Sequence, residues 1–459
     1  MKKRPETAYK LDRDDLSFLR VLWCDNGNIT RSKSIHMPSL KARHPAEMHP
    51  EHRRRALMNS IDRALTISAA LQSLPCVFDE PVPEAGLEPV KEIRLVPDWS
   101  TLAFPPNTPG YACVMADMVR DTDPWALCPR DLLRRSARTL ADKGYDLGAG
   151  AELGLFRFAA EAFYSDGRLE PADRDLYAQN SAHEAVRDIV DEIAETIYGM
   201  GIPLAYYNAE AGPGQHELSL QYCGALELSD RIVLAREAIK SVARDYGLIA
   251  SFLPKIYEDS TGSGCHIHLS LWSESKNVLG GDDGSWSLSA AGESFMAGVL
   301  EHLPALMAFT TPTPNSFRRI IPQYWSGAYR VWGVDNKEAA LRVLADHENG
   351  YPKQFELKTS DSSANPYVAL SGIIAAGTDG IARNMKLPEP LQRNPGNLSD
   401  EERSALGVEL LPGSLDEALE ELERDGVLRN ALGEHYYSVY TAIKRFEAEH
   451  LRGFDLEKE

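Results

Sequence analysis

Four separated segments of the chain carry side chains that could bind metal ions and phosphate groups. Glu152 lies in the mostly apolar run at residues 151–158. A carboxylate buried there needs a partner, because an unpaired charge away from water is costly. Glu210 and Glu217 flank a Gly-Pro-Gly turn at residues 212–214, which could direct both carboxylates into one cavity. Two carboxylates in one cavity repel each other unless a cation lies between them.

The other two segments supply imidazoles and cations. His266 and His268 are two residues apart in the strand-like run 265–272, so both side chains should face the same side and could hold a divalent metal or a polyphosphate. A later segment concentrates cations in a chain that is acidic overall, which suggests an anionic ligand. These residues are Arg318, Arg319, Arg330, Lys337, Arg342 and Lys353, with Glu356 and Lys358 close behind.

Each segment also has an ordinary structural explanation: solvated glutamates, core histidines, or a solvated basic face. Together they match what phosphoryl transfer needs, namely metals on the phosphate oxygens and Arg or Lys on the developing charge. The standard P-loop, H-E-x-x-H and G-x-S-x-G motifs do not occur in the sequence. The glycine-rich run 148–154 has the wrong spacing for a dinucleotide loop, and we expect it to form a turn.

Hydrophobic periodicity predicts the elements that position these residues. We expect strands where apolar residues alternate or form short runs bounded by turn residues, at 16–23, 29–35, 93–96, 151–158, 216–222 and 265–272. Helical spacing predicts helices at 60–74, 130–144 and 180–199. A turn is expected at residues 25–28 (Asp-Asn-Gly-Asn). The organisation suggests a small mixed α/β domain that ends near residue 120, followed by a larger α/β segment.

Composition narrows the class of protein. With 459 residues and 43% hydrophobic residues the chain can bury a core, and its length suits two or three domains, or one large domain with a smaller one. A net charge of -19 repels phosphate backbones and anionic lipid, so we expect neither nucleic acid nor membrane as a partner. Six scattered cysteines without a C-x-x-C pair, and no apolar signal or spanning segment, predict a cytoplasmic protein.

Short motifs along nearly the whole chain resemble the glutamine synthetase family, in the family's order. They are L-V-P-D-W-S-T (95–101), A-E-L (151–153), E-A-G-P-G-Q-H-E (210–217), G-S-G-C-H-I-H-L-S (262–270), N-S-F-R-R (315–319), D-N-K-E-A-A-L-R (335–342), F-E-L-K (355–358), and A-N-P-Y-V-A-L with A-G-T-D-G-I (364–381).

The resemblance implies an α+β fold, with an N-terminal β-grasp domain over residues 1–120 and a catalytic domain over 121–459 whose curved antiparallel sheet lines the active site. It implies an ATP-dependent carboxylate–amine ligase of nitrogen or amine metabolism that uses Mg²⁺ or Mn²⁺. Glutamate or a glutamate-like acid would be phosphorylated, and ammonia or a small amine would attack the acyl phosphate. Family members form homo-oligomeric rings with shared active sites, so a dodecamer is expected.

The resemblance also assigns the metal ligands. One metal, which binds the nucleotide phosphates, would be held by Glu152, His266 and Glu356. A second metal, beside the glutamate and the amine, would be held by Glu210 and Glu217. This assignment makes all five residues metal ligands.

The nucleotide and the transferring phosphoryl group have their own implied residues. His268 and Ser270 would lie near the ATP. Lys337 and Arg342 would bind it and stabilise the phosphoryl group during transfer. With Arg319, these two cations are the expected catalytic residues.

At the substrate end the sequence departs from the family pattern. Arg319 and Lys358 would bind the carboxylates of the acid, although the family has a second arginine where this chain has Lys358. Gly154 replaces a metal carboxylate of the family's E-x-E, which leaves open whether a water or Glu161 takes over. Trp325 replaces the glutamate of P-G-Y-E that takes a proton from ammonium.

A further departure lies at residues 78–82, where F-D-E-P-V replaces the family's F-D-G-S-S, a segment that helps to bind ammonium. These changes favour a larger, more apolar amine pocket, in which Trp325 would contact an alkyl or aryl amine beside Glu210. We therefore expect a γ-glutamyl-amide ligase, similar to γ-glutamyl-amide or γ-glutamylpolyamine synthetases. The alternatives are true glutamine synthesis, a catalytically silent member, and an acid other than glutamate.

Overall fold

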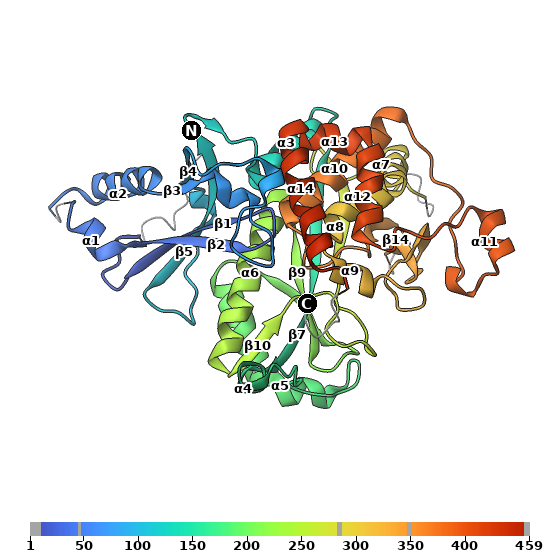
Figure 1. Ribbon diagram of the computed structural model, residues 1–459, viewed down its shortest axis with the longest axis horizontal. Helices are drawn as coiled ribbons and strands as arrows, with labels where there is room; N and C mark the ends of the chain where they lie inside the picture. Colours follow the sequence, from blue (N-terminus) through green and yellow to red (C-terminus); the bar gives the residue numbers. More distant parts are fainter. Residues whose placement is uncertain (1–10, 45–46, 282–286, 347–350, 454–459) are drawn as a thin grey trace.

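A computed structural model describes residues 11–44, 47–281, 287–346 and 351–453, whose strands form two sheets. The smaller sheet lies at one end of the molecule in Figure 1 and has the strand order β2-β1-β5-β4-β3, with β6 paired to β5. Its strands are β1 (Phe18–Cys24), β2 (Thr30–His36), β3 (Thr66–Ser68), β4 (Glu92–Pro97), β5 (Tyr111–Arg120) and β6 (Asp123–Pro124). The pairing of β1 with β5 is parallel, and the other pairs of this sheet are antiparallel.

Two helices follow the first hairpin: α1 (Met37–Lys41) and α2 (Pro50–Ala64). Helix α2 packs against β4 and buries Leu57, Met58 and Ile61. That this N-terminal unit is a β-grasp domain that ends near residue 120 stays a prediction.

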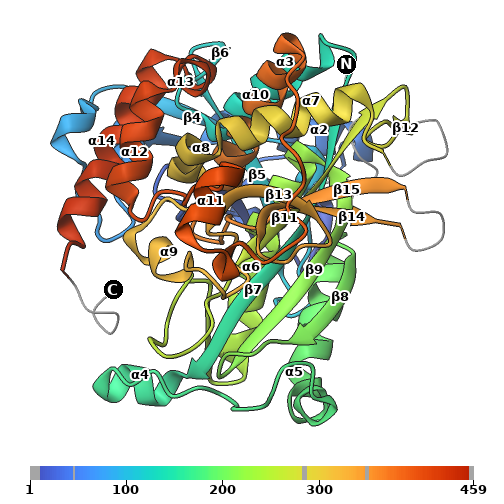
Figure 2. The same ribbon diagram turned by 90° about the vertical axis from the view of Figure 1, so that its right-hand side faces the viewer.

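The larger sheet carries the functional residues and has the order β13-β14-β15-β11-β7-β9-β8. Its strands are β7 (Asp146–Ala159), β8 (Leu204–Ala209), β9 (Gln215–Gly224), β11 (Cys265–Ser273), β13 (Tyr329–Val334), β14 (Ala339–Ala345) and β15 (Pro352–Leu357), with β10 (Leu248–Ser251) on β7 and β12 (Lys276–Asn277) on β11. Strand direction turns along the sheet, from β7 and β9 to β14 and β15, so the sheet curls (Figure 2). The β13–β14 pair is parallel, an exception to the antiparallel sheet that the resemblance implied.

Helices cover one face of this sheet because its strands alternate. On β7 the odd-numbered residues from Leu147 to Leu155 are buried and apolar, whereas Glu152 and three glycines occupy the even positions. Helices α3 and α6 pack against β7, and α10 packs against these two helices. The helices of this part are α3 (Pro129–Ala141), α4 (Ala160–Asp166), α5 (Asn180–Gly199), α6 (Ala225–Asp245), α7 (Ala290–Glu301), α8 (Leu303–Thr310), α9 (Pro314–Arg319), α10 (Pro366–Arg383), α11 (Asp400–Leu406), α12 (Leu415–Arg424), α13 (Gly426–Leu432) and α14 (Glu434–His450).

The turn between β1 and β2 connects the N-terminal sheet to the larger part of the chain. Its residues 25–28 form the predicted turn and insert between segments that are distant in sequence. Asn365 donates to the Asp25 carbonyl (2.8 Å), and Tyr436 donates to the side chain of Asn26 (2.6 Å). Asn28 donates to the carbonyl of Ser362 (3.0 Å), which lies just beyond the strand that carries Glu356. The N-terminal sheet is thereby anchored to α10, to α14 and to the segment between β15 and α10.

Most predicted elements are confirmed with small shifts in their ends: the strands β1, β2, β4, β7, β9 and β11 and the helices α3 and α5. The helix predicted at 60–74 is wrong beyond residue 64. Thr66–Ser68 instead forms β3, because pairing with β4 places Ile67 opposite Ile93 in the core. The turn predicted at 148–154 is also wrong, since this run is the middle of β7. A Cβ at Gly148 would lie 2.1 Å from the Tyr222 hydroxyl, so the Tyr222 ring packs against the backbone of β7 at this glycine.

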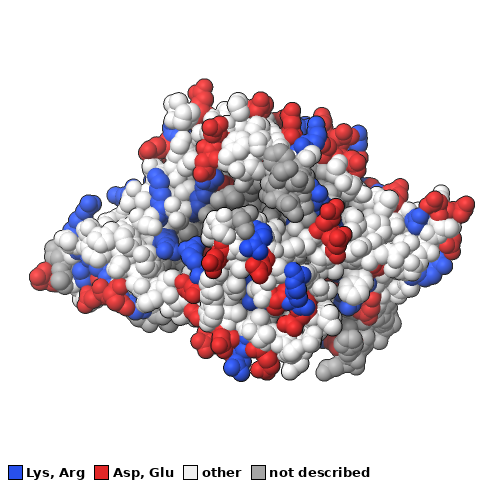
Figure 3. Space-filling model, turned by 60° about the horizontal axis from the view of Figure 1, so that its bottom comes forward, with Lys and Arg blue, Asp and Glu red and all other residues white. Residues whose placement is uncertain are grey.

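Acidic and basic side chains are interspersed over the face of the molecule shown in Figure 3. Among the described residues, none of the helices combines the length and the apolar character needed to cross a bilayer.

Candidate active site

Strand register brings the predicted site residues onto one face of the curled sheet. His266 of β11 lies opposite Glu152 of β7, and His268 lies opposite Glu356 of β15. On either side, β14 places Arg342 opposite Glu356, and β9 places Glu217 opposite Gly154. Since alternate residues of a strand share a face, residues that are more than 200 positions apart in the sequence meet at one surface.

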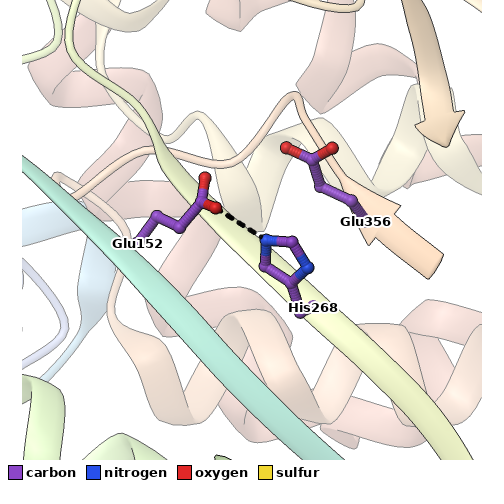
Figure 4. A group of neighbouring side chains, drawn as sticks. All are labelled: Glu152, His268 and Glu356. Carbon is purple, nitrogen blue, oxygen red and sulfur yellow. Dashed lines mark hydrogen bonds and ion pairs between the residues drawn. The ribbon is translucent and has the colours of Figure 1, made fainter. Parts of the chain in front are cut away.

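Glu152 is the centre of this cluster. Its carboxylate contacts both histidines, His266 Nδ1 at 3.0 Å and His268 Nε2 at 2.9 Å, which confirms that the two imidazoles face the same side. Burial opposes ionisation of this carboxyl, but the hydrogen bonds and charges of the histidines lower the pKa of Glu152. Figure 4 shows Glu152, His268 and Glu356 converging from three different strands on a common space.

The pKa values of the two histidines are shifted in opposite directions. Burial and the charge of Lys358 lower the pKa of His266, although Glu152 and Glu356 lie within 3.2 Å of its Nδ1. For His268 burial also acts against the charged form, but the contact with Glu152 outweighs it and raises the pKa. A neutral imidazole can donate a lone pair to a metal, and the lowered pKa of His266 favours that neutral form.

The donor atoms form two groups that share Glu152, each with all ligand atoms within 4.8 Å of one another. One group is Glu152, His268 and Glu356, and the other is Glu152, Glu217 and His266. Carboxylate oxygens suit Mg²⁺ or Mn²⁺, and imidazole is a ligand for divalent transition metals. Burial and the charges of the neighbouring carboxylates raise the pKa of Glu217 to about 9, the repulsion that a bound cation would relieve. The residues present therefore fit a divalent cation.

Glu356 is buried and surrounded by cations. One of its oxygens accepts from Arg342 (3.0 Å) and the other from Lys358 (3.1 Å), and only 2% of the residue is exposed. Burial opposes its ionisation, but the charges of Lys358 and His266 lower the pKa of this carboxyl. Loss of Glu356 would leave these three partners without their common anion.

A pocket of about 300 Å³ opens beside the cluster. The predicted site residues that line it are Glu152, Glu210, Glu217, His266, Arg319, Trp325, Lys337, Arg342, Glu356 and Lys358. The pocket is therefore rich in both signs of charge, with carboxylates for cations and Arg or Lys for anions. Asn208, one of the lining residues, donates to Glu210 (2.6 Å), and burial raises the pKa of that glutamate.

Other candidates lie outside the pocket lining. Ser270, which was expected near ATP, is 1% exposed and accepts the indole N–H of Trp272 (2.6 Å). His268 is not among the lining residues, although its Nε2 lies 2.9 Å from a carboxylate oxygen of Glu152. Of the remaining cations, Arg330 pairs with Glu301 (2.7 Å) and with Glu409, at the surface.

Arg319 combines a structural role with its place in the pocket. It is 5% exposed, and its Nη2 donates to three consecutive carbonyls, those of Lys358 (3.2 Å), Thr359 (2.6 Å) and Ser360 (3.1 Å). This bonding fixes the segment that follows β15. Burial lowers the pKa of the guanidinium.

Gly154 is surrounded so closely that no side chain fits. A Cβ there would lie 2.4 Å from Ser263 Oγ and 2.7 Å from the carbonyl oxygen of Gly264. The loop before β11 thus occupies the space into which a side chain at 154 would project. Glu161, considered as a replacement carboxylate, is exposed on α4 and is not part of the pocket lining.

Sequence reasoning missed several lining residues: Tyr177, Asn208, Gln215, Thr261 and Tyr324. Gln215 and Thr261 lie inside or beside the motifs at 210–217 and 262–270, so their neighbours gave a signal. No local pattern marks Tyr177, because it lies in an irregular segment before α5 and reaches the pocket only through the fold.

Comparisons with known proteins agree with this geometry. The family model described as the glutamine synthetase catalytic domain matches residues 126–456. A glutamine synthetase of Pyrococcus furiosus is 37% identical over 327 residues, 71% of this chain and 73% of that protein. The γ-glutamylpolyamine synthetase GlnA3 of Streptomyces coelicolor is 34% identical over 379 residues, 80% and 79% of the two chains. A solved GmaS–ADP complex superposes with a TM-score of 0.80 at 25% identity and covers 98% of this chain and 97% of its own.

Proposed function

The chain belongs to the glutamine synthetase family and is an ATP-dependent acid–amine ligase, and from this premise we propose that it joins the γ-carboxylate of glutamate to an organic amine. The observation that carries the choice of an organic amine is Trp325. Its indole lines the pocket at the position where the family pattern has a carboxylate for ammonium.

The charged residues divide the work of such a reaction between them. Mg²⁺ or Mn²⁺ would be held by Glu152, Glu217, His266, His268 and Glu356. When bound, the ion would polarise phosphate oxygens as a Lewis acid. Glu210, which lines the same pocket, would be a further metal ligand or would contact the amine.

The cations of the pocket act on the anionic groups. Lys337 and Arg342 bind the phosphates and balance the charge that develops on the transferred phosphoryl group, since both line the pocket. Arg319 and Lys358 bind the carboxylates of the acid, where Lys358 provides a point charge rather than a two-pronged contact. Attack of a γ-carboxylate oxygen on the γ-phosphorus of ATP breaks the bond to ADP and forms an acyl phosphate. The amine nitrogen then attacks the acyl carbon, phosphate leaves, and loss of a proton from the nitrogen gives the amide.

The amine would meet aromatic rings at the mouth of the pocket. Tyr177, Tyr324 and Trp325 line it and are each at least half exposed, so they are accessible to a ligand. Aromatic faces bind alkyl chains by burial and ammonium groups by cation–π contact. A polyamine, which has both, is a suitable first candidate given the S. coelicolor relative.

The test is ADP release with ATP, Mg²⁺ and glutamate, supplemented in turn with ammonia, methylamine, benzylamine, putrescine and spermidine. We expect an organic amine to give the highest kcat/KM and the matching γ-glutamyl amide to be found by mass spectrometry. Glu356→Ala should abolish turnover, whereas the surface variant Glu301→Ala should not change it. Glutamine synthesis is the second candidate, favoured by the P. furiosus relative, and an ammonia kcat/KM far above that of every amine would establish it instead. Undiminished turnover in Glu356→Ala would contradict the assigned metal site.

A further inference from the structure

The loop at residues 322–326 holds Trp325 in an unusual backbone conformation. Trp325 has φ 55° and Gln323 has φ 66°, both in the left-handed region that L-residues with large side chains rarely adopt. The Trp325 side chain is 56% exposed, so burial of the ring does not account for this conformation. Contacts with the rest of the protein must stabilise it.

The base of the loop is closed by a single side chain. Ser326 Oγ donates to the carbonyl of Ile321 (2.8 Å) and accepts the N–H of the same residue (3.1 Å). These bonds fix the two ends of the loop but leave its tip, where Trp325 lies, to other contacts.

Glu338 provides the contact at the tip. Its Oε1 accepts the backbone N–H of Trp325 at 3.3 Å, although Glu338 lies in the turn before β14. The turn itself is fixed, since the N–H of Glu338 donates to Asn336 Oδ1 (3.1 Å). The neighbouring Lys337 places its ammonium 5.5 Å from the centre of the Trp325 ring, within cation–π range. Glu338 therefore contacts the backbone of Trp325, and the preceding residue, Lys337, contacts its indole.

Glu338 is also unusual in its burial. It is 4% exposed, and its Oε2 is buried without a hydrogen-bond partner among the described residues. A buried carboxylate that is only partly satisfied is costly, so its presence calls for a role that offsets this cost.

We propose that Glu338 is a positioning residue that sets the amine specificity of the pocket by holding Trp325 in its left-handed conformation over the pocket mouth. This inference rests on the proposed function in that it takes the ligand at Trp325 to be the amine. Without the Glu338 contact, Trp325 relaxes to an ordinary backbone conformation, and the indole leaves the place where it meets the amine.

The kinetic test compares Glu338→Ala, Glu338→Gln, Trp325→Ala and the double variant Glu338→Ala/Trp325→Ala with the best amine of the panel. Glu338→Ala should raise the KM for the amine about tenfold, with KM for glutamate and ATP changed less than about twofold. Glu338→Gln keeps an oxygen acceptor and should restore most of the loss. In the Trp325→Ala background, Glu338→Ala should add no further effect, because it acts through the indole.

Glu417→Ala is the matched control, since Glu417 also accepts a backbone N–H (Gly413, 2.8 Å) and is not part of the pocket lining. It should leave all KM values unchanged. Equal losses in Glu338→Ala and Glu338→Gln, or additive losses in the double variant, would overturn the proposal.

Amide hydrogen exchange followed by mass spectrometry provides a readout that does not depend on turnover. Peptides that contain Trp325 should exchange faster in Glu338→Ala and at the wild-type rate in Glu338→Gln. Unchanged exchange in Glu338→Ala would overturn the proposal even if an amine is ligated. Faster exchange in a protein that ligates no amine would locate the failure in the proposed function instead.

Discussion

At the residue scale, the candidate site is organised by one carboxylate with two imidazole partners. Glu152 lies within hydrogen-bond distance of His266 and His268, which lower the pKa of its carboxyl. Burial and the neighbouring carboxylates instead raise the pKa of Glu217 to about 9. Opposite pKa shifts in neighbouring acids are typical of functional sites, and a cation between the carboxylates would relieve their repulsion.

The raised pKa of Glu217 predicts proton release on metal binding. With a pKa of about 9, this carboxyl would be largely protonated at pH 7, and a cation binds the ionised form. Mn²⁺ binding should therefore release a proton from it and tighten as the pH rises from 7 towards 9. Calorimetric titration with MnCl₂ in buffers of different ionisation enthalpy measures this proton. Glu217→Gln should remove that proton and weaken binding. Identical proton release in the variant and the wild type would contradict the assignment.

At the element scale, alternation along four strands decides which side chains face the pocket. In β7, β11, β14 and β15, buried apolar residues alternate with the site residues, which are Glu152, His266, His268, Arg342 and Glu356. Where another segment of the chain crosses a strand closely, the strand residue beneath that segment must be small. At Gly154 that room is taken by the loop with Ser263 and Gly264.

Packing at Gly154 predicts that a carboxylate cannot be restored there. Gly154→Ala should lower the free energy of unfolding by about 1–3 kcal/mol, because its Cβ would collide with Ser263 and Gly264. Urea denaturation measures the loss, and Ser263→Gly in the same chain should recover part of it. Gly426→Ala is the control, since nothing lies within 4 Å of a Cβ at that position. A Gly154→Ala variant as stable as the wild type would show that the loop yields easily.

At the scale of the whole molecule, residues 78–82 lie apart from the pocket of their own chain. Asp79 pairs with Arg31 (2.8 Å) and Val82 is 2% exposed, and neither belongs to the pocket lining. If this segment contributes to an amine site, as the family resemblance implies, it does so in a neighbouring subunit. A ring-shaped homo-oligomer stays our prediction. Size-exclusion chromatography with light scattering would measure the mass of the assembly and so test it.

Shared sites predict complementation between two inactive variants. We expect Asp79→Ala and Glu356→Ala to be impaired when each is expressed alone. When both are co-expressed with different tags and purified on both, random assembly leaves roughly a quarter of the sites with both native residues. Activity near that fraction of the wild type would support sharing. No gain over the separate variants would place residues 78–82 outside the active site.

The sequence by itself determined the residue types of the site, their order and the strands that carry most of them. Glu152, His266 and His268 could be placed because alternation within one strand is a local property. The pairing of β11 with β7 and β15, the filled space at Gly154 and the hold of Glu338 on Trp325 were decided by the tertiary structure alone. Each depends on contacts between segments far apart in the chain, and local periodicity carries no information about which distant segments meet.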